Sequence, residues 1–298
     1  MTPPLFPDFK RVGLEDQGFI KEQISRFPSE ACELNFGNIF IWRNFEYPQF
    51  TLINQNLCLL CEPLSEPAYF LPPVGENRME ETVRTCLTRA PRLSRVPESL
   101  VQKYSSRLKW EPDRDNFDYI YLAEDLIHLK GKRYDGKRNR IKRFEKNHSY
   151  RYLSLQGRDL EGCRSLLDEW LEAKSLPESI LSTQKDVIKE AFAYFEVLGL
   201  VGGAVVVDNR IAAFSIGEVL SGDTAVIHIE IASPRYEGLS QLLNREFVKN
   251  ELSSYTYINK EQDIGIPGLR RAKLSYHPHH LVKKFNLWAE KNQEFLKG

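Results

Sequence analysis

The sequence has no apolar run long enough to cross a membrane. Runs such as residues 200–207 fall far short of the roughly 20 residues that a transmembrane helix needs. The first residues, Met-Thr-Pro-Pro-Leu-Phe-Pro, lack the basic stretch and apolar core of a signal peptide. The five cysteines are an odd number without the spacing of a disulfide framework, which predicts free thiols in a reducing compartment. We therefore expect a cytoplasmic protein without a transmembrane segment.

Common catalytic and metal-binding motifs are missing as well. There is no G-x-S-x-G nucleophile elbow, no P-loop and no dinucleotide-binding fingerprint. Cys58 and Cys61 have CxxC spacing but lie in an apolar run without a second pair of ligands, so we interpret them as thiols of a buried strand. The histidines at 277, 279 and 280 have no cysteine or carboxylate cluster nearby in the sequence, which favours a surface position. No metal site is predicted.

The formal net charge is zero, but the charge is unevenly distributed. Between Lys130 and Arg151 there are ten Lys or Arg residues against Asp135 and Glu145, a local net charge of +8. Such a segment is compatible with one phosphate-bearing partner, for example a tRNA backbone or a cofactor phosphate. The alternative is a solvated helix face. The candidate phosphate-binding residues here are Lys132, Lys137, Arg138 and Asn139.

The second half of the chain has the clearer pattern of helices and strands. A turn at residues 208–210 joins two apolar runs into a hairpin. The predicted order is strand 151–155, helix 160–173, helix 182–197, strands 200–207, 211–219 and 224–232, helix 239–252, strand 256–259, and then a helix and a last strand. This is the element order of the GNAT acyltransferase fold.

The first half repeats this order more faintly, without a visible sequence repeat. We predict helices 14–27 and 32–43, strands 49–54, 57–62 and 68–71, helix 77–90, strand 92–96, helix 97–108 and strand 118–122. A chain of 298 residues suits two domains of roughly 150 residues each. The expected fold is therefore α/β, with two tandem GNAT-like domains whose mixed, mainly antiparallel sheets are flanked by helices. We place them at residues 1–128 and 129–298, with the basic helical segment 129–148 leading into the second.

Two stretches resemble a known family. They are residues 129–144, LKGKRYDGKRNRIKRF, and residues 259–278, NKEQDIGIPGLRRAKLSYHP. Together with His228-Ile229-Glu230 they resemble the C-terminal domain family of phosphatidylglycerol lysyltransferases, which is distantly similar to the Fem-type tandem GNAT aminoacyltransferases. The resemblance implies transfer of an aminoacyl group from aminoacyl-tRNA to a hydroxyl or amine. This chain departs from the lysyltransferases in lacking a transmembrane domain, which argues against a lipid acceptor.

His228 and Glu230 are the candidate catalytic residues. They alternate on the predicted strand 224–232 and should therefore point to one side of the sheet. A carboxylate there would orient or deprotonate the acceptor, or anchor a substrate ammonium, with the histidine assisting. The alternative is that both hydrogen-bond to neighbouring structure.

The segment 259–276 combines acidic and basic side chains with two glycines, which suits a zwitterionic amino acid. The alternative is an ordinary polar loop leading into a helix. The resemblance favours substrate binding by Asn259, Glu261, Asp263, Arg270, Lys273 and Tyr276.

A third set of candidate binding residues lies at the helix start where GNAT proteins bind pyrophosphate. Arg235, Gly238 and Ser240 match the R/Q-x-x-G-x-G/A pattern only in part, so acyl-CoA binding is permitted but not required. The leading hypothesis is a GNAT-type acyl- or aminoacyltransferase whose donor is aminoacyl-tRNA or an acyl-CoA. The alternatives are a CoA-dependent N-acetyltransferase and a non-catalytic protein that binds an amino acid or RNA.

Overall fold

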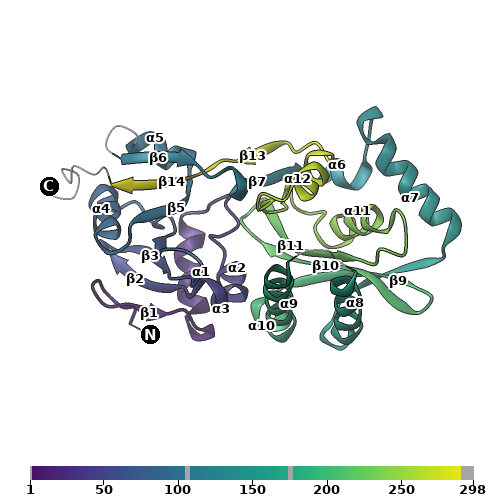
Figure 1. Cartoon of the computed structure of the whole chain (residues 1–298), viewed down its shortest axis with the longest axis horizontal. Helices are drawn as coiled ribbons and strands as arrows, with labels where there is room; N and C mark the ends of the chain where they lie inside the picture. The colour runs from purple at the N-terminus through teal and green to yellow at the C-terminus, as the bar shows by residue number, and fades with distance from the viewer. Residues whose placement is uncertain (1, 105–107, 174–176, 290–298) are drawn as a thin grey trace. The chain divides into compact units, whose positions relative to one another are not determined.

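The computed structural model describes residues 2–104, 108–173 and 177–289 (Figure 1). The chain divides into two compact units. Unit 1 comprises the described residues among Met1–Asp118, Gln262–Arg270 and Leu281–Gly298. Unit 2 comprises those among Tyr119–Glu261 and Arg271–His280. Each unit is built around one seven-stranded mixed sheet.

Unit 1 has the sheet order β1-β2-β3-β4-β5-β14-β6. Strands β4 and β5 are parallel, whereas β1–β2, β2–β3, β3–β4, β5–β14 and β14–β6 are antiparallel pairs. Helices α4 and α5 supply Val83, Cys86 and Val101 to the core of this sheet. The elements are β1 Lys10–Arg11, η1 Leu14–Asp16, α1 Gln17–Arg26, α2 Phe36–Ile41, α3 Arg43–Glu46, β2 Gln49–Ile53, β3 Asn56–Cys61, β4 Tyr69–Phe70, α4 Met79–Arg89, β5 Arg92–Pro97, α5 Glu98–Tyr104, β6 Leu108–Pro112, η2 Arg114–Asn116 and β14 Lys284–Ala289.

Unit 2 has the sheet order β13-β7-β12-β11-β10-β9-β8. Its elements are β7 Asp118–Leu122, α6 Ala123–His128, η3 Lys132–Tyr134, α7 Asp135–Asn147, β8 Tyr150–Ser154, η4 Gly157–Asp159, α8 Leu160–Glu172, α9 Glu178–Ala193, α10 Phe195–Leu198, β9 Val201–Val207, β10 Arg210–Val219, β11 Thr224–Ala232, α11 Leu239–Glu251, β12 Tyr257–Asn259, α12 Pro267–Leu274 and β13 His280–Val282. Helix α11 packs on one face of the sheet, and α8 and α9 lie on the other (Figure 1). Within the described ranges, no helix has both the length and the hydropathy that a membrane-spanning helix requires.

Each sheet contains a strand whose pairing partner is far away in the sequence. Strand β14 pairs with β5 and β6 in the first sheet, and β7 lies beside β12 in the second. We had predicted instead that strand 118–122 is the last strand of the first domain and that the last strand of the chain belongs to the second domain. Hydrophobic burial explains the exchange: Phe285 and Leu287 of β14 complete the core of unit 1, and Tyr119, Ile120 and Tyr121 of β7 are buried. The units consequently do not follow the expected segments 1–128 and 129–298.

Most other predicted elements are present, with local differences. The helix expected over 182–197 starts earlier, because α9 already begins at Glu178, directly after Pro177. The helix expected over 97–108 is shorter: Pro97 ends β5, and Leu108 starts the unpredicted strand β6. The helix expected from Cys32 begins at Phe36, where the side chain of Asn35 accepts a hydrogen bond from the first turn.

Candidate functional site

The candidate site lies where β11 and β12 of unit 2 cease to pair. Their parallel pairing covers only Thr224–Val226 and Tyr257–Asn259, whereas β11 continues to Ala232. His228 and Glu230 belong to this continuing part. Burial alternates along it, because Ile227, Ile229 and Ile231 are buried while Glu230 is exposed. The residues that follow β12 supply partners for both side chains.

Glu230 is a carboxylate between two donors. Its Oε2 lies 2.6 Å from Nζ of Lys260, and its Oε1 accepts a 2.9 Å hydrogen bond from Asn244 of α11. The side chain is 28% exposed. Burial raises the pKa of Glu230, but Lys260 and Asn244 lower it further, so the net shift is downward. The group is therefore ionised near neutral pH.

The amide of Asn244 has a buried oxygen whose hydrogen-bonding capacity is not used within the described residues. Its side chain is 1% exposed, and among the described residues its Oδ1 has no hydrogen-bond partner. Buried polar atoms are nearly always hydrogen-bonded. Among the described residues, Oδ1 is therefore an unsatisfied acceptor on the same amide that donates to Glu230.

His228 is held between two other carboxylates. Its Nδ1 lies 2.7 Å from Oε1 of Glu261, and its Nε2 lies 3.0 Å from Oε1 of Glu218. The ring is 3% exposed. Burial alone would lower the pKa of His228, but the two carboxylates raise it to about 10. The imidazole is thus protonated near neutral pH, with both nitrogens occupied by Glu261 and Glu218, whereas the partners of Glu230 are Lys260 and Asn244.

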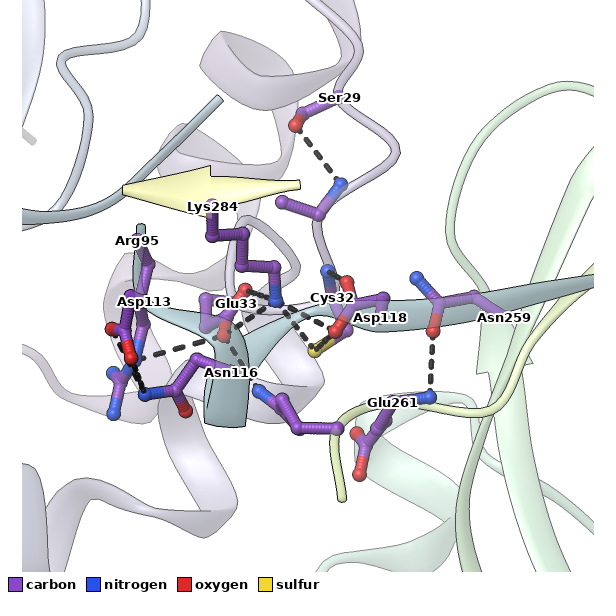
Figure 2. Close-up of polar contacts among 12 residues, drawn as sticks. Ser29, Cys32, Glu33, Arg95, Asp113, Asn116, Asp118, Asn259, Glu261 and Lys284 are labelled. Carbon is purple, nitrogen blue, oxygen red and sulfur yellow. Dashed lines mark hydrogen bonds and ion pairs between the residues drawn. The ribbon is translucent and has the colours of Figure 1, made fainter. Parts of the chain in front are cut away.

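The chain around Lys260 is fixed by its neighbours in unit 2. Asn259 is buried, and its Oδ1 accepts a 2.7 Å hydrogen bond from the backbone N–H of Glu261 (Figure 2). The Lys273 ammonium donates to the carbonyl of Lys260, and Tyr121 donates to the carbonyl of Lys273 at 2.8 Å. Asn259 and Lys273, predicted to bind substrate, use these atoms to shape the loop that presents Lys260.

Asp263 and Arg270, the other predicted substrate-binding pair, belong to unit 1. Two hydrogen bonds of 2.8 and 2.9 Å join the Arg270 guanidinium to Asp263. Asp263 also contacts Arg114 at 3.1 Å, and Arg270 contacts Asp115 at 2.7 Å. The acidic and basic side chains that suggested an amino-acid site are therefore paired with one another or with neighbours.

The basic segment forms α7, with Ile141 and Phe144 buried. Arg138 donates to the carbonyls of Leu129 and Gly131 and therefore holds the preceding turn in place. Other cations have acidic partners: the ion pairs are Lys130–Glu124, Arg133–Asp125 and Arg143–Glu237. Within the described part of the chain, no ion pair involves the exposed residues Lys132, Arg140, Lys142 and Lys146. Asn139 is exposed as well.

The helix start at Gly238 is closely approached by α7. Gly238 has φ +90°, and a Cβ there would lie 2.3 Å from the carbonyl oxygen of Arg140. Arg235 pairs with Glu169 of α8 at 3.2 Å, and Ser240 is exposed. Close packing against α7 therefore accounts for a glycine at position 238, and a bound phosphate is not needed to explain it.

Unit 1 contains a buried charged cluster (Figure 2). Cys32, Glu33 and Asp118 bring three potential metal ligands together, but the Lys284 ammonium lies 2.6 Å from both Glu33 and Asp118. Lys284 is 0% exposed. Burial would lower the pKa of Lys284, but Asp118, Cys32 and Glu33 raise it. The ammonium thus occupies the position where a cation would bind. Elsewhere in this unit, Cys58 and Cys61 are buried free thiols on β3, as predicted.

Lys260, Asn244 and Glu218 are the site residues that the sequence analysis missed. Lys260 directly follows a short strand, between two residues that were singled out, so its position was a usable signal. Asn244 and Glu218 reach the site only through the packing of α11 and β10 on β11, which no local pattern shows.

Comparison with known proteins identifies relatives over nearly the whole chain. The family model described as phosphatidylglycerol lysyltransferase, C-terminal, matches residues 24–287. A conserved protein of unknown function from Bacteroides thetaiotaomicron superposes with TM-score 0.88 at 29% identity, covering 95% of this chain and 99% of its own. L-PGS from Bacillus licheniformis superposes with TM-score 0.67 at 15% identity, covering 95% of this chain and 93% of its own. FemX superposes with TM-score 0.61 at 8% identity, covering 96% of this chain and 98% of its own. These likenesses show a tandem GNAT-like α/β fold. No curated protein matches the sequence.

Proposed function

Because the chain belongs to the phosphatidylglycerol lysyltransferase C-terminal family, we propose that it is a cytoplasmic acyltransferase that moves an aminoacyl group from aminoacyl-tRNA to an amine or hydroxyl. The observation that carries this proposal is the partly exposed Glu230 carboxylate, held by Lys260 and by Asn244, whose Oδ1 has no hydrogen-bond partner among the described residues. A partly exposed carboxylate has lone pairs left to accept from an N–H or O–H donor, such as the nucleophile of an acceptor substrate. The five free cysteines support a reducing compartment.

In the proposed reaction, the acceptor nitrogen or oxygen donates a hydrogen bond to Glu230 and attacks the ester carbonyl of the donor. A bond forms from the acceptor atom to the carbonyl carbon, and the ester C–O bond breaks. The proton lost by the acceptor ends on the leaving ribose oxygen. Lys260, 2.6 Å from Glu230, is the nearest ammonium that can stabilise the charge that develops on oxygen. The lowered pKa of Glu230 makes it a weak base, which favours orientation of the acceptor as its main role.

His228 is a positioning residue in this proposal. A proton held between Glu218 and Glu261 is poorly available for general-base work. The imidazolium instead fixes the side chain of Glu261, whose backbone directly follows Lys260. The predicted assistance by His228 is therefore indirect.

The donor is proposed to be aminoacyl-tRNA rather than acyl-CoA. The exposed cations Lys132, Lys142 and Lys146, with Asn139, form an outward surface for a phosphate backbone. The helix start that would bind the CoA pyrophosphate is backed by the Arg140 carbonyl at Gly238, and Arg235 is already paired with Glu169.

The test is transfer of a radiolabelled amino acid from a charged tRNA pool, in parallel with transfer from acetyl-CoA, to a panel of amines, amino sugars, glycerol compounds and peptides. We expect product only with charged tRNA. Product with acetyl-CoA alone would support the N-acetyltransferase alternative instead. Binding of charged tRNA without any transfer to the panel, and without hydrolysis of the ester, would favour the non-catalytic alternative.

A further inference from the structure

The ring of Tyr276 gathers cations from two separate elements of unit 2. The Lys137 ammonium, from α7, lies 3.9 Å from the ring centroid, and the Lys260 ammonium, which follows β12, lies 5.3 Å from it. Tyr276 itself is 8% exposed. An ammonium above an aromatic face is attracted by the ring, but only modestly. The ring therefore organises these charges without neutralising them.

The carboxylates nearby do not balance this charge. Lys137 donates to the neutral hydroxyl of Ser275 at 2.6 Å, and within the described ranges no ion pair involves Lys137 or Arg140. Glu230 is bound by Lys260. The charges of Arg140 and Lys260 both act on Lys137, adding to burial in lowering its pKa to about 8. Among the described residues, Lys260 is thus the one cation of the three that has a carboxylate partner, an arrangement that is unfavourable until an anion arrives.

We propose that Lys137 and Lys260, which both contact the ring of Tyr276, form a binding site for a single phosphate group of the donor substrate together with Arg140, which lies about one turn beyond Lys137 on α7. Phosphate suits this site because its several acceptor oxygens can be bound by separate cations. Lys260 also contacts Glu230, which places the bound phosphate one side chain from the proposed reacting group. Naming the donor as its source rests on the proposed function, whereas binding of phosphate itself does not.

The site has a built-in pH dependence. The groups that face Lys137 are Arg140 from its own helix, Lys260 after β12, and Ser275 and Tyr276 after α12. A bound anion stabilises the Lys137 ammonium, so binding above pH 8 takes up a proton. Relative to a Lys137→Arg variant, in which the ionisation of the ligand is the same, affinity should be constant below about pH 8 and should fall by about tenfold per pH unit above it.

The experiment is titration calorimetry of the full chain with inorganic pyrophosphate at pH 7 and pH 9, in buffers of different ionisation enthalpy. We expect Lys137→Gln to weaken binding by roughly 10- to 100-fold and to abolish the proton uptake that exceeds the contribution of pyrophosphate itself. Lys137→Arg should keep binding and retain only the pH dependence that comes from the ionisation of pyrophosphate itself. Lys249→Gln, an exposed lysine of α11, is the matched control and should bind as the parent does.

Three results would overturn the site: no pyrophosphate binding at millimolar concentration, equal losses in Lys137→Gln and Lys249→Gln, or an unchanged pH profile in Lys137→Arg. The source of the phosphate is separated by competing pyrophosphate with a CCA oligonucleotide or with coenzyme A. Lys137-dependent competition by the oligonucleotide supports the tRNA donor, whereas competition by coenzyme A alone contradicts it. Lys137-dependent pyrophosphate binding in a protein that transfers nothing would leave the site standing while the proposed function fails.

Discussion

The substitution Glu230→Gln separates charge from shape at the candidate site. Glutamine has nearly the same volume, and its carbonyl oxygen can still accept from Lys260. Its new amide can donate to Oδ1 of Asn244, which has no partner among the described residues, once the Asn244 amide turns over. The variant therefore loses the negative charge while retaining hydrogen bonds on both sides.

The expected change in stability is small. The Glu230 side chain is 28% exposed, so its ion pair with Lys260 is partly screened by solvent, and such pairs contribute about 1 kcal/mol or less. A loss of that size lowers Tm by roughly 2–4 °C for a domain of this size. Because the folded-state pKa of Glu230 is lowered, this contribution is present above pH 4.5, the ordinary pKa, and disappears as pH falls through the folded value.

The expected change in activity is large. If Glu230 accepts the acceptor's proton in the transition state, kcat/KM should fall by about 10²–10⁴. If it anchors or orients the acceptor, the loss should appear mainly in KM. The assay is initial-rate transfer with the donor identified by the screen, beside thermal melts of both proteins and of Glu172→Gln, an exposed position on α8. Full activity with an unchanged melt would remove Glu230 from the mechanism, and a collapsed melt would make it a structural carboxylate.

Three further predictions concern buried charges and close packing within the two units. Because the pKa of His228 is raised to about 10, its ionic contribution to the free energy of unfolding should be complete below pH 6.5 and should decrease toward pH 10. Urea unfolding of the parent and of His228→Gln at pH 6, 8 and 9.5 measures this contribution. A difference in unfolding free energy that stays constant with pH would contradict the double ion pair. Gly238→Ala should cost about 1–3 kcal/mol, because it adds a methyl group against the Arg140 carbonyl at positive φ; an unchanged urea midpoint would show that α7 moves away freely. Lys284→Met should cost about 3–5 kcal/mol by leaving Glu33 and Asp118 buried without a cation, and calorimetric melts that show no loss would argue against the cluster.

The sequence alone determined the elements whose signals are local. The hairpin formed by β9 and β10, with Asp208 and Asn209 at its turn, and the strand Thr224–Ala232 were predicted almost to the residue. Alternating polarity, apolar runs and turn residues act over a few positions, so they can be read without knowing the fold. The family resemblance, carried largely by residues 129–144 and 259–278, likewise needed no structure.

Only the tertiary structure decided which sheet each late strand joins and which charges meet. From the sequence, β14 and β7 were predicted as ordinary strands that close a domain. The strand that each pairs with depends on burial against residues far away in the sequence, so no local pattern indicates it. The same holds for the site. Glu230 and Lys260 are separated along the chain, and their 2.6 Å contact arises where β11 runs past the end of β12. Side-chain partners across a sheet depend on register and on the paths of loops, which propensity and periodicity do not encode.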